Sequence, residues 1–299
     1  MDLTVVILTK DEEANIEKCI RSFRGIVARF VIVDSFSTDR TKEICLDLGL
    51  DVYEHPFTDH ASQLNWALEN TNITTQWTMR MDADEELTGE LCDEMEAKIK
   101  TIPDSINGII LKRRVYFMGR WIKHGDVYPQ CLLRIFRTGT AVCEQKLMDE
   151  HMILLEGTSI IFEKDMIDNN TKKLDWWTQK HNWYSNKEMS EYLLGKEKVK
   201  NDREIRPSLL KGQAERKRWL KNILYYKAPL FTRPALYFFY RYVVKLGFLD
   251  GKEGIVFHFL QGFWYRFLVD AKIYEHEKNE ITMATLNHNR SKIINEKHN

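Results

Sequence analysis

The sequence has 299 residues, of which 43% are hydrophobic and 29% charged, so the chain can bury a large core and a disordered protein is excluded. Its 44 basic and 44 acidic residues give a formal net charge of zero, which argues against nucleic-acid binding by the charge of the whole protein. The five cysteines contain no C-x-x-C pair, so neither a disulfide framework nor a zinc site is predicted. The N-terminus starts with a strand-like run instead of a secretion signal, and we therefore expect a cytoplasmic protein.

Short apolar runs alternate with helical patterns over the N-terminal part of the chain. Four runs, at residues 3–9, 30–34, 51–53 and 77–81, are short and rich in residues that favour strands. The segments between these runs carry apolar residues three or four positions apart, which is typical of helices. This alternation predicts an α/β fold with a mostly parallel sheet and right-handed crossovers.

Acidic residues follow the ends of these predicted strands at Asp11, Asp34 and Asp84. Open α/β sheets bind their ligands at this edge. Asp82 and Asp84 are two positions apart, so in an extended chain their side chains would point to the same side and could hold one cation together. Their oxygens suit Mg²⁺ or Mn²⁺, whose other ligands are usually water and substrate phosphates. The alternative is a solvated loop that leads into the acidic first turn of a helix beginning near Thr88.

After a helix expected over residues 88–100, the pattern changes. Segments 108–111, 115–117 and 131–136 are typical of strands separated by glycine-containing connections, and we expect them to extend the sheet. The sequence contains neither a G-x-G-x-x-G motif nor a Walker lysine loop, which counts against a dinucleotide oxidoreductase or an NTPase.

The C-terminal half of the sequence is helix-prone and differs in composition. Between positions 196 and 221, ten basic residues outnumber four acidic ones, which indicates either a solvated helical face or attraction to anionic groups. Two aromatic-rich runs follow, at residues 236–244 and 255–268; both are shorter than a membrane span and both contain Arg or His. These runs fit helices that lie in a membrane interface. Packing of the same helices on the rest of the protein or on a second subunit is the alternative.

Three motifs, taken in order, resemble family 2 glycosyltransferases, whose architecture is the nucleotide-binding GT-A fold. The motifs are TKDEE at residues 9–13, VIVDSFSTDRT at residues 31–41 and DADE at residues 82–85. Within this family the chain is similar to bacterial enzymes that build lipopolysaccharide core, O-antigen or capsule, on the residues MDEH at 148–151 and WWTQKHNWY at 176–184. The resemblance covers most of the chain and is strongest in its N-terminal part.

The resemblance implies inverting transfer of a sugar from a nucleotide-diphosphate donor, usually a UDP-sugar, to a hydroxyl of a lipid-linked or lipopolysaccharide- or capsule-type glycan. The residues that would border the nucleotide sugar are Thr9, Asp11, Glu12, Asp34, Gln63, Asn65 and Asp82. Asp34 would accept a hydrogen bond from the base, and Gln63 and Asn65 would make polar contacts to the donor. The family usually has Asn where this chain has Asp11, which leaves the hydrogen bond of Asp11 open.

The resemblance also implies a metal site and a base. Asp84 would hold Mg²⁺ or Mn²⁺ across the diphosphate, and Asp82 would contact ribose or metal-bound water. A divalent cation offsets the negative charge of the leaving diphosphate, and inversion needs a carboxylate that removes the proton of the acceptor hydroxyl. Two adjacent acids stand where the family has its base; we favour Glu150, with Asp149 second and His151 as a candidate to orient one of them.

This interpretation divides the chain into three parts. Residues 1–170 would form the nucleotide-sugar-binding and catalytic domain, residues 171–285 a helical extension for membrane, acceptor or oligomer contacts, and residues 286–299 a disordered tail. We expect a peripheral protein on the inner face of the cytoplasmic membrane. Its expected partners are a nucleotide sugar, a glycan acceptor and the membrane surface, and nucleic acid is not among them. Whether the protein forms a homo-oligomer is left open. The alternatives are a nucleotidyltransferase with a related sheet and a non-catalytic membrane-associated scaffold.

Overall fold

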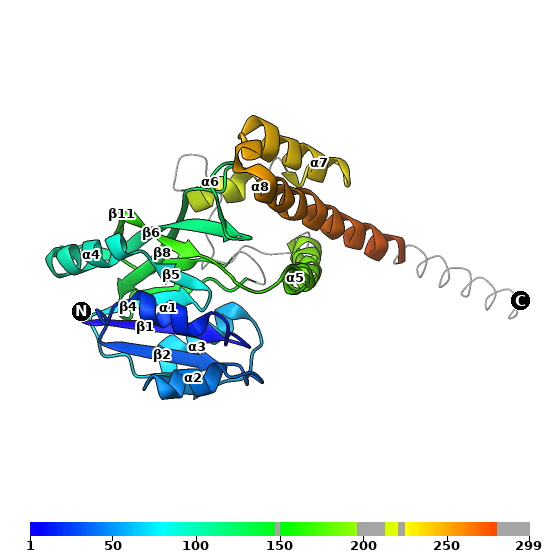
Figure 1. Ribbon diagram of the computed structural model, residues 1–299. Coiled ribbons are helices and arrows are strands. Elements are labelled where there is room, and N and C mark those ends of the chain that lie inside the picture. Colours follow the sequence, from blue (N-terminus) through cyan, green and yellow to red (C-terminus); the bar gives the residue numbers. More distant parts are fainter. Residues whose placement is uncertain (147–149, 196–212, 221–224, 280–299) are drawn as a thin grey trace, which may run out of the picture.

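The structure is a computed structural model of the 299-residue chain, and it describes residues 1–146, 150–195, 213–220 and 225–279. A large β-sheet with helices packed against it forms the centre, and a helical C-terminal region lies at one end (Figure 1). The strands of the sheet are β1 (Leu3–Thr9), β2 (Arg29–Asp34), β3 (Asp51–Glu54), β4 (Trp77–Asp82), β5 (Glu85–Leu87), β6 (Ile106–Phe117), β7 (Arg120–Ile122), β8 (Gln130–Arg137) and β11 (Thr158–Asp168). Their order is β3-β2-β1-β4-β8-β6-β11-β5, and β7 pairs with β6.

The first four strands form a parallel sheet, as the sequence predicts. β1 pairs in parallel with β2 and with β4, and β2 pairs in parallel with β3. The helices in the connections are α1 (Ile16–Ser22), α2 (Thr41–Asp47) and α3 (His60–Asn70). Val5 and Ile7 pack into the cluster that contains α1 residues, whereas Val6 packs with residues of α3. Because both faces of β1 are covered, the strand is hydrophobic at nearly every position.

The other half of the sheet mixes directions. β8 is antiparallel to β4 and to β6, β11 is parallel to β6, and β5 is antiparallel to β11. The two strands predicted at residues 108–111 and 115–117 belong to the single strand β6. β11 has no clear signal in the sequence because charged residues at 163–165 interrupt its apolar pattern. The predicted α/β class is confirmed, and all strand pairs among β1 to β4 are parallel.

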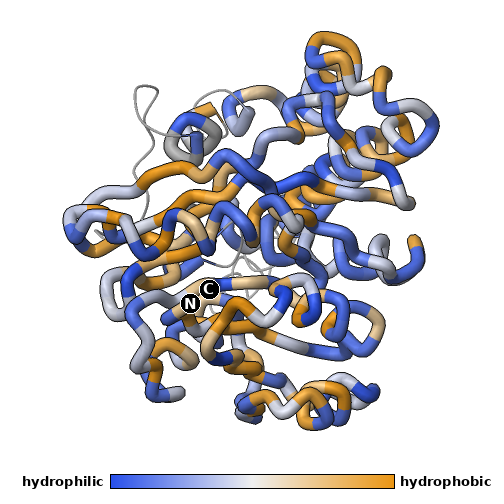
Figure 2. Tube along the Cα trace, turned by 60° about the vertical axis from the view of Figure 1, so that its left-hand side comes forward, coloured by the Kyte–Doolittle hydropathy of each residue, from blue (hydrophilic) through white to orange (hydrophobic). Residues whose placement is uncertain are grey.

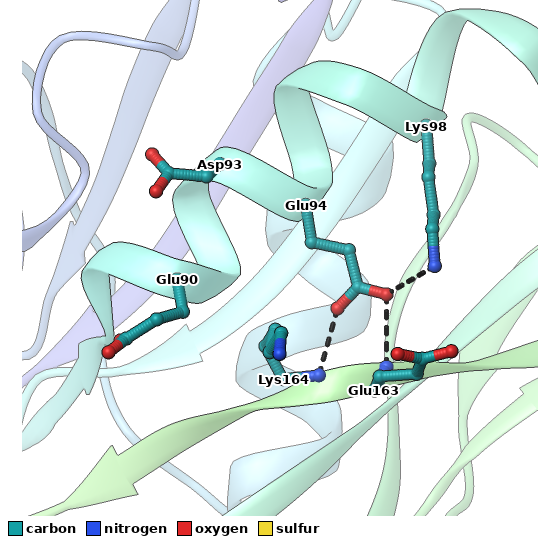
Figure 3. Close-up of a pocket in the computed structure, with 6 residues that line it drawn as sticks. All are labelled: Glu90, Asp93, Glu94, Lys98, Glu163 and Lys164. Carbon is teal, nitrogen blue, oxygen red and sulfur yellow. Dashed lines mark hydrogen bonds and ion pairs between the residues drawn. The ribbon is translucent and has the colours of Figure 1, made fainter.

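Helix α4 (Gly89–Lys98) lies against β11 and is followed by the short 3₁₀ helix η1 (Ile99–Thr101). As predicted, the helix begins after Thr88, whose hydroxyl accepts a hydrogen bond from the N–H of Leu91 at 3.2 Å. A shallow pocket between α4 and β11 is lined by Glu90, Asp93, Glu94, Lys98, Glu163 and Lys164 (Figure 3). Glu94 accepts hydrogen bonds from the backbone N–H groups of Glu163 and Lys164 at 3.0 and 2.8 Å. This carboxylate therefore ties the helix to the strand, and the pocket contains none of the predicted site residues.

The C-terminal region is helical and rich in aromatic side chains, as predicted. Its helical segments include α5 (Leu174–Gly195), α6 (Gln213–Leu220), α7 (Thr232–Phe239), α8 (Gly251–Phe257), the 3₁₀ helix η4 (Gly247–Asp250) and the π-helical turns η3 (Tyr240–Val244) and η5 (His258–Trp264). Residues 265–279 continue as an α-helix after η5. None of the described helices is both long and apolar enough to cross a membrane. Most of the basic stretch 196–221 and the predicted tail 286–299 lie outside the described residues. The division into separate domains near residue 170 stays a prediction.

An aspartate links this helical region to the sheet. The carboxylate of Asp250 accepts a hydrogen bond from the backbone N–H of His124 at 2.9 Å, and the His124 ring nitrogen Nδ1 lies 2.7 Å from the same carboxylate. Arg241 donates to the carbonyl oxygen of Gly125 at 2.9 Å. Phe257 packs with apolar residues that include Phe117 beneath this link. The C-terminal helices are thus fixed to the β6–β7 end of the sheet.

Candidate active site

Two loops at the carboxyl ends of β1 and β2 are hydrogen-bonded to each other. The N–H of Asp11 donates to the Ser37 hydroxyl at 2.8 Å, and the N–H of Thr38 donates to the Asp11 carboxylate at 2.7 Å. The N–H of Glu12 donates to the hydroxyl of Thr41 at 2.7 Å. Asp11 has a φ of +54°, a left-handed conformation that Asn and Asp adopt more readily than most residues. The Asp11 carboxylate therefore shapes the loop pair.

Asp34 ends β2 and is almost completely buried, with 1% of its surface exposed. Its carboxylate accepts hydrogen bonds from the Thr9 hydroxyl at 2.8 Å and from the Ser37 N–H and hydroxyl at 2.7 and 2.6 Å. The Asp34 carboxylate thus connects the end of β1, at Thr9, with the loop that follows β2. A contact between Asp34 and a nucleotide base stays a prediction.

Gln63 and Asn65 on α3 are bonded within the protein, in contrast to the predicted contacts with the donor. The Gln63 side chain has no exposed surface, and its amide NH₂ group donates to the Ser35 hydroxyl at 3.0 Å and to the carbonyl oxygen of His55 at 3.1 Å. The Asn65 amide pairs with the backbone N–H and carbonyl of Cys143 at 2.8 and 3.0 Å. Burial of Gln63 and the backbone pairing of Asn65 give these amides structural roles, and their contacts with the donor stay predictions.

The predicted metal pair stands at a turn. β4 ends at Asp82, and Ala83 and Asp84 form a turn before β5, so the extended backbone that we expected for this pair is wrong. One oxygen of the Asp84 carboxylate accepts a hydrogen bond from the Asn170 amide at 2.8 Å, and the Asp84 carbonyl accepts one from the N–H of Asn169 at 3.0 Å. The segment between β11 and α5 therefore positions Asp84.

Asp82 lies close to two arginines and a histidine. Arg134 of β8 donates to its carboxylate at 3.1 Å, and Arg80 Nε and His60 Nε2 lie 3.7 and 3.8 Å from the other oxygen. Burial opposes ionisation, but Arg134, Arg80 and His60 outweigh it and hold the pKa of Asp82 well below its ordinary value. A metal ion at this carboxylate would therefore be repelled by the two arginines, and Asp84 has no such cation among its hydrogen-bond partners.

A buried carboxylate that the sequence analysis missed lies behind this pair. Glu85 has no exposed surface, binds Arg134, and accepts hydrogen bonds from Arg113 at 2.9 Å and from the N–H of Asp82 at 2.9 Å. Burial raises its pKa to about 7 although both arginines act in the opposite direction. Asp168 lies 3.3 Å from Arg113, and burial raises its pKa to about 6. These groups form a buried charged network beneath the site.

Glu150 lies at the same site as Asp82. The His60 ring nitrogen Nδ1 is 3.2 Å from the Glu150 carboxylate, and Arg80 Nη2 is 3.9 Å from the same oxygen. His60 and Arg80 therefore contact both carboxylates. Asp149 lies outside the described residues. The His151 ring lies 3.9 Å from the Glu144 carboxylate, and its predicted role beside the base stays a prediction.

The sequence around His60 carries no motif that marks it as a site residue, because its partners come from β4 and from beyond β9 (Ala141–Cys143). β9 pairs with β10 (Met152–Leu154) in a separate antiparallel ladder. Glu150 lies two residues before the start of β10. This small ladder brings the predicted base towards the end of β4.

The face of α5 next to the site is aromatic and basic. Lys172, just before the helix, pairs with Glu12 at 2.6 Å, and burial raises the pKa of Glu12 although Lys172 acts against it. Farther along, Lys187 lies 4.0 Å from the centre of the Trp183 ring. Burial lowers the pKa of Lys187 although Glu150 and another carboxylate favour its charged form. This helix therefore supplies positive charge along the site.

The residues fit a divalent cation held by few protein ligands. In the described parts of the chain, no three His, Cys, Asp or Glu side chains form a metal cage. Mg²⁺ and Mn²⁺ sites in nucleotide enzymes do not require one, because one or two carboxylates and substrate phosphates complete the shell. The Asp84 carboxylate is partly exposed and has an amide instead of a cation as its hydrogen-bond partner. Asp84 is the better donor of the pair.

Comparisons with known proteins agree on a family. The model of the family described as Glycosyl transferase family 2 matches residues 4–163. An uncharacterized glycosyltransferase of Rickettsia bellii is 39% identical over 94 residues, which make up 31% of this chain and 31% of that protein. A similar protein of Rickettsia typhi is 37% identical over 94 residues, or 31% of this chain and 32% of that protein. The matches thus span about a third of the length of these curated relatives.

Solved structures are more distant. Glucosyl-3-phosphoglycerate synthase from Mycobacterium tuberculosis, in complex with Mn²⁺, UDP and glucosyl-3-phosphoglycerate, is 22% identical; the match covers 38% of this chain and 44% of that chain with a TM-score of 0.32. TarS from S. aureus is 12% identical, with 93% of this chain and 92% of that chain covered and a TM-score of 0.45. At these values the likenesses carry no argument about chemistry.

Proposed function

Because the chain belongs to glycosyl transferase family 2, we propose that it is an inverting, metal-dependent glycosyltransferase that uses a nucleotide-diphosphate sugar as donor. The observation that carries the proposal is the meeting of Glu150 and Asp82 at the end of β4 through His60 and Arg80, next to Asp84. The proposed base, Glu150, is thus a neighbour of the residues proposed to bind the donor diphosphate. UDP is the expected nucleotide because it is the usual one in the family that the sequence resembles.

Glu150 is the proposed base. Its carboxylate takes the proton of the acceptor hydroxyl while that oxygen forms a bond to the anomeric carbon. The bond from this carbon to the donor diphosphate breaks, and the leaving group departs with the electron pair. His60, with Nδ1 at 3.2 Å, and Arg80, at 3.9 Å, hold the Glu150 carboxylate in place. Asp149 stays the second candidate for the base.

Asp84 is the proposed metal ligand, and Asp82 a weaker one that contacts ribose or metal-bound water. A bound Mg²⁺ or Mn²⁺ would supply Lewis-acid neutralisation of the charge that develops on the diphosphate. Asn170 orients the Asp84 carboxylate through its hydrogen bond at 2.8 Å. The loop pair that contains Thr9, Asp11 and Glu12 would border the nucleotide.

A donor screen with purified protein tests this function. Release of nucleoside diphosphate from a panel of nucleotide sugars, with Mn²⁺ and a lipid-linked glycan fraction as acceptor, should identify the donor. Release of pyrophosphate instead would favour the nucleotidyltransferase, and absence of any turnover would favour the scaffold. With the donor known, Glu150→Gln should lower turnover about 10²- to 10⁴-fold while nucleotide affinity is kept.

Asp84→Asn should lower turnover to a similar extent and also weaken Mn²⁺ binding. The matched control is Glu86→Gln, which changes a carboxylate that forms an ion pair with Lys18 at 2.7 Å and should leave turnover and Mn²⁺ binding unchanged. Normal turnover by Asp84→Asn would remove the metal assignment. If Glu150→Gln and Asp149→Asn both turn over normally, neither residue is the base.

The proposed acceptor is a lipid-linked or lipopolysaccharide- or capsule-type glycan, reached by a protein that is peripheral on the cytoplasmic face of the membrane. The support is a C-terminal apolar face, defined here by the exposed side chains of Leu236, Phe239, Val243, Val244, Phe248, Leu249, Ile255 and Phe259. The hydrophobic stretches of these helices lie at the end of the molecule farthest from α2 (Figures 1 and 2). Exposed apolar patches of this kind mark membrane or protein contacts.

Flotation with vesicles of phosphatidylethanolamine and phosphatidylglycerol tests the membrane contact. The double variant Leu236→Asp and Phe239→Asp, at side chains 62% and 56% exposed, should stay in the soluble fraction while the unchanged protein floats. Leu46→Asp on α2, 54% exposed, is the matched control and should float normally. Equal flotation of the double variant would contradict membrane binding through this face. If the unchanged protein does not float and is a dimer, and the double variant is a monomer, this face binds a second subunit instead.

A further inference from the structure

Two aromatic rings from distant parts of the chain meet at one lysine. The ammonium nitrogen of Lys187, on α5, is 4.0 Å from the centre of the Trp183 ring and 5.6 Å from the centre of the Phe57 ring. Trp183 precedes Lys187 by one helical turn, whereas Phe57 belongs to the connection between β3 and α3. Trp183 and Phe57 are 45% and 44% exposed. These three residues, named here the α5 platform, therefore present two aromatic rings and an ammonium to solvent.

The α5 platform lies beside the segments that carry the proposed base and its histidine. Phe57 stands three residues before His60, so the Cα atoms of these two residues are at most about 11 Å apart. The His60 ring nitrogen Nδ1 is in turn 3.2 Å from the Glu150 carboxylate. Glu191, one turn after the lysine of the platform, pairs with Lys146 at 3.3 Å. The segment before α3 and the segment before Glu150 thus both contact the same face of α5.

A sugar ring suits the α5 platform. One face of a pyranose consists mainly of C–H groups, which pack on an aromatic ring because both surfaces are apolar. The hydroxyls project from the edge of the same sugar and accept hydrogen bonds from an ammonium group. Single exposed aromatic side chains are common on protein surfaces. Two rings that converge on a cation next to a proposed base have instead the composition of a ligand site, in which aromatic groups supply contact area and a few polar groups fix orientation.

We propose that Trp183 and Phe57 stack on the acceptor sugar and that Lys187 donates a hydrogen bond to one of its hydroxyls. The inference rests on the function proposed above and adds an acceptor subsite to it. The hydroxyl from which Glu150 takes the proton belongs to this sugar, so the ring must lie between Glu150 and the α5 platform. The group bound here is therefore the sugar at the end of the acceptor and not its lipid.

Steady-state kinetics on the full chain separate the binding of the two substrates. Trp183→Ala removes the larger ring, Phe57→Ala removes the smaller one, and Trp183→Phe keeps an aromatic surface. Lys187→Met removes the ammonium and keeps a long side chain. The acceptor is the lipid-linked glycan fraction of the donor screen, varied at saturating donor, and the donor is then varied at saturating acceptor. Tyr274→Ala, at a ring that is 51% exposed and contacts Phe231, is the matched control.

The KM for the acceptor should rise while the other constants stay nearly unchanged. Trp183→Ala should raise this KM at least about tenfold, because the contact surface for the sugar is lost. Its kcat and its KM for the donor should change less than about threefold, because neither the base nor the donor site is altered. Phe57→Ala and Lys187→Met should each raise the acceptor KM by about threefold or more. Trp183→Phe should recover most of the acceptor affinity, and Tyr274→Ala should behave like the unchanged protein.

Several outcomes would overturn the inference and leave the proposed function intact. One is an unchanged acceptor KM in Trp183→Ala, in a protein whose unchanged form transfers sugar. A lower kcat with the acceptor KM unchanged is another, because the ring would then act through the position of Glu150. A higher KM for both substrates would indicate a distorted site and would also count against the α5 platform.

Vesicle flotation separates sugar from lipid as the group that Trp183 binds. Trp183→Ala should float to the same extent as the unchanged protein, and a loss of flotation would assign the ring to lipid and overturn the inference. An unchanged acceptor KM in Lys187→Met would remove the hydrogen bond proposed for the lysine. Absence of sugar transfer by the unchanged protein would overturn the proposed function and the inference together.

Discussion

The two sides of the candidate active site hold their carboxylates by different means. On the nucleotide side, Asp34 and Asp11 accept hydrogen bonds from hydroxyl and backbone N–H groups of adjoining loops, across 25 and 27 residues of sequence. On the other side, Asp82 and Glu85 bind the guanidinium of Arg134, across 52 and 49 residues. The first arrangement uses neutral donors from neighbouring loops, and the second uses a cation from a distant strand.

This difference determines how each side should respond to change. A hydrogen bond from a neutral donor to a carboxylate contributes about 1.5 to 3 kcal/mol, because the same groups bond to water in the unfolded chain. Removal of one partner of a buried ion pair leaves a charge without compensation and costs more, about 3 to 5 kcal/mol. We therefore expect the network around Glu85 to be more sensitive to substitution than the loop pair around Asp11.

The largest effect should follow from Arg134→Met. The guanidinium is 3% exposed and binds both Asp82 and Glu85, so its loss leaves two carboxylates at a buried position with less compensation. We expect the free energy of unfolding to fall by about 3 to 5 kcal/mol, measured by urea unfolding. Arg40→Met, in the exposed pair with Glu43, is the control and should leave the unfolding midpoint unchanged. Equal midpoints for both variants would contradict the contrast between the two sides.

A pH dependence of stability should come next in size. Burial raises the pKa of Glu85 from its ordinary 4.5 to about 7, so the native state holds a proton that the unfolded chain releases at lower pH. Stability is then highest below the unfolded pKa and falls as pH rises from about 4.5 to about 7, by up to about 1.4 kcal/mol per pH unit from this group. Asp168, raised to about 6, contributes in the same direction.

Glu85→Gln tests this pH dependence because the amide keeps the shape and loses the titration. Urea unfolding between pH 5 and pH 8 should show a smaller loss of stability in this variant than in the unchanged protein. Glu86→Gln on the same strand should keep the full loss. If Glu85→Gln retains the same slope, ionisation of Glu85 is not the cause.

The smallest effect should follow from Thr41→Val. The Thr41 hydroxyl is buried, accepts the N–H of Glu12 at 2.7 Å and donates to the Asp39 carboxylate at 2.5 Å. Loss of these two bonds should lower the free energy of unfolding by about 1 to 2 kcal/mol. Thr101→Val, at an exposed hydroxyl after α4, should change stability less. A loss as large as that in Arg134→Met would show that the loop pair is no more tolerant than the buried network.

The sequence predicts those parts of the fold that depend on local patterns of neighbouring residues. Apolar periodicity predicts β1 to β4 and the helices between them, because each of these elements buries a regular stripe or face. β11 is not predicted from the sequence, because it has no local strand pattern. It is a strand because it pairs with β6 and β5. The turn at Asp84 is not predicted either, because hydrogen bonds from the distant residues 169 and 170 stabilise it.

The sequence by itself thus determined the parallel half of the sheet, the acidic residues at its strand ends and the family. Tertiary structure alone decided which groups oppose those acids: Arg134 from β8 beside Asp82, His60 from α3 beside Glu150, and the Asn170 amide beside Asp84. The physical reason is that an acidic motif can be recognised from neighbouring residues, whereas its charge partners are brought to it by strand order and helix packing. No local pattern in the sequence records these pairings.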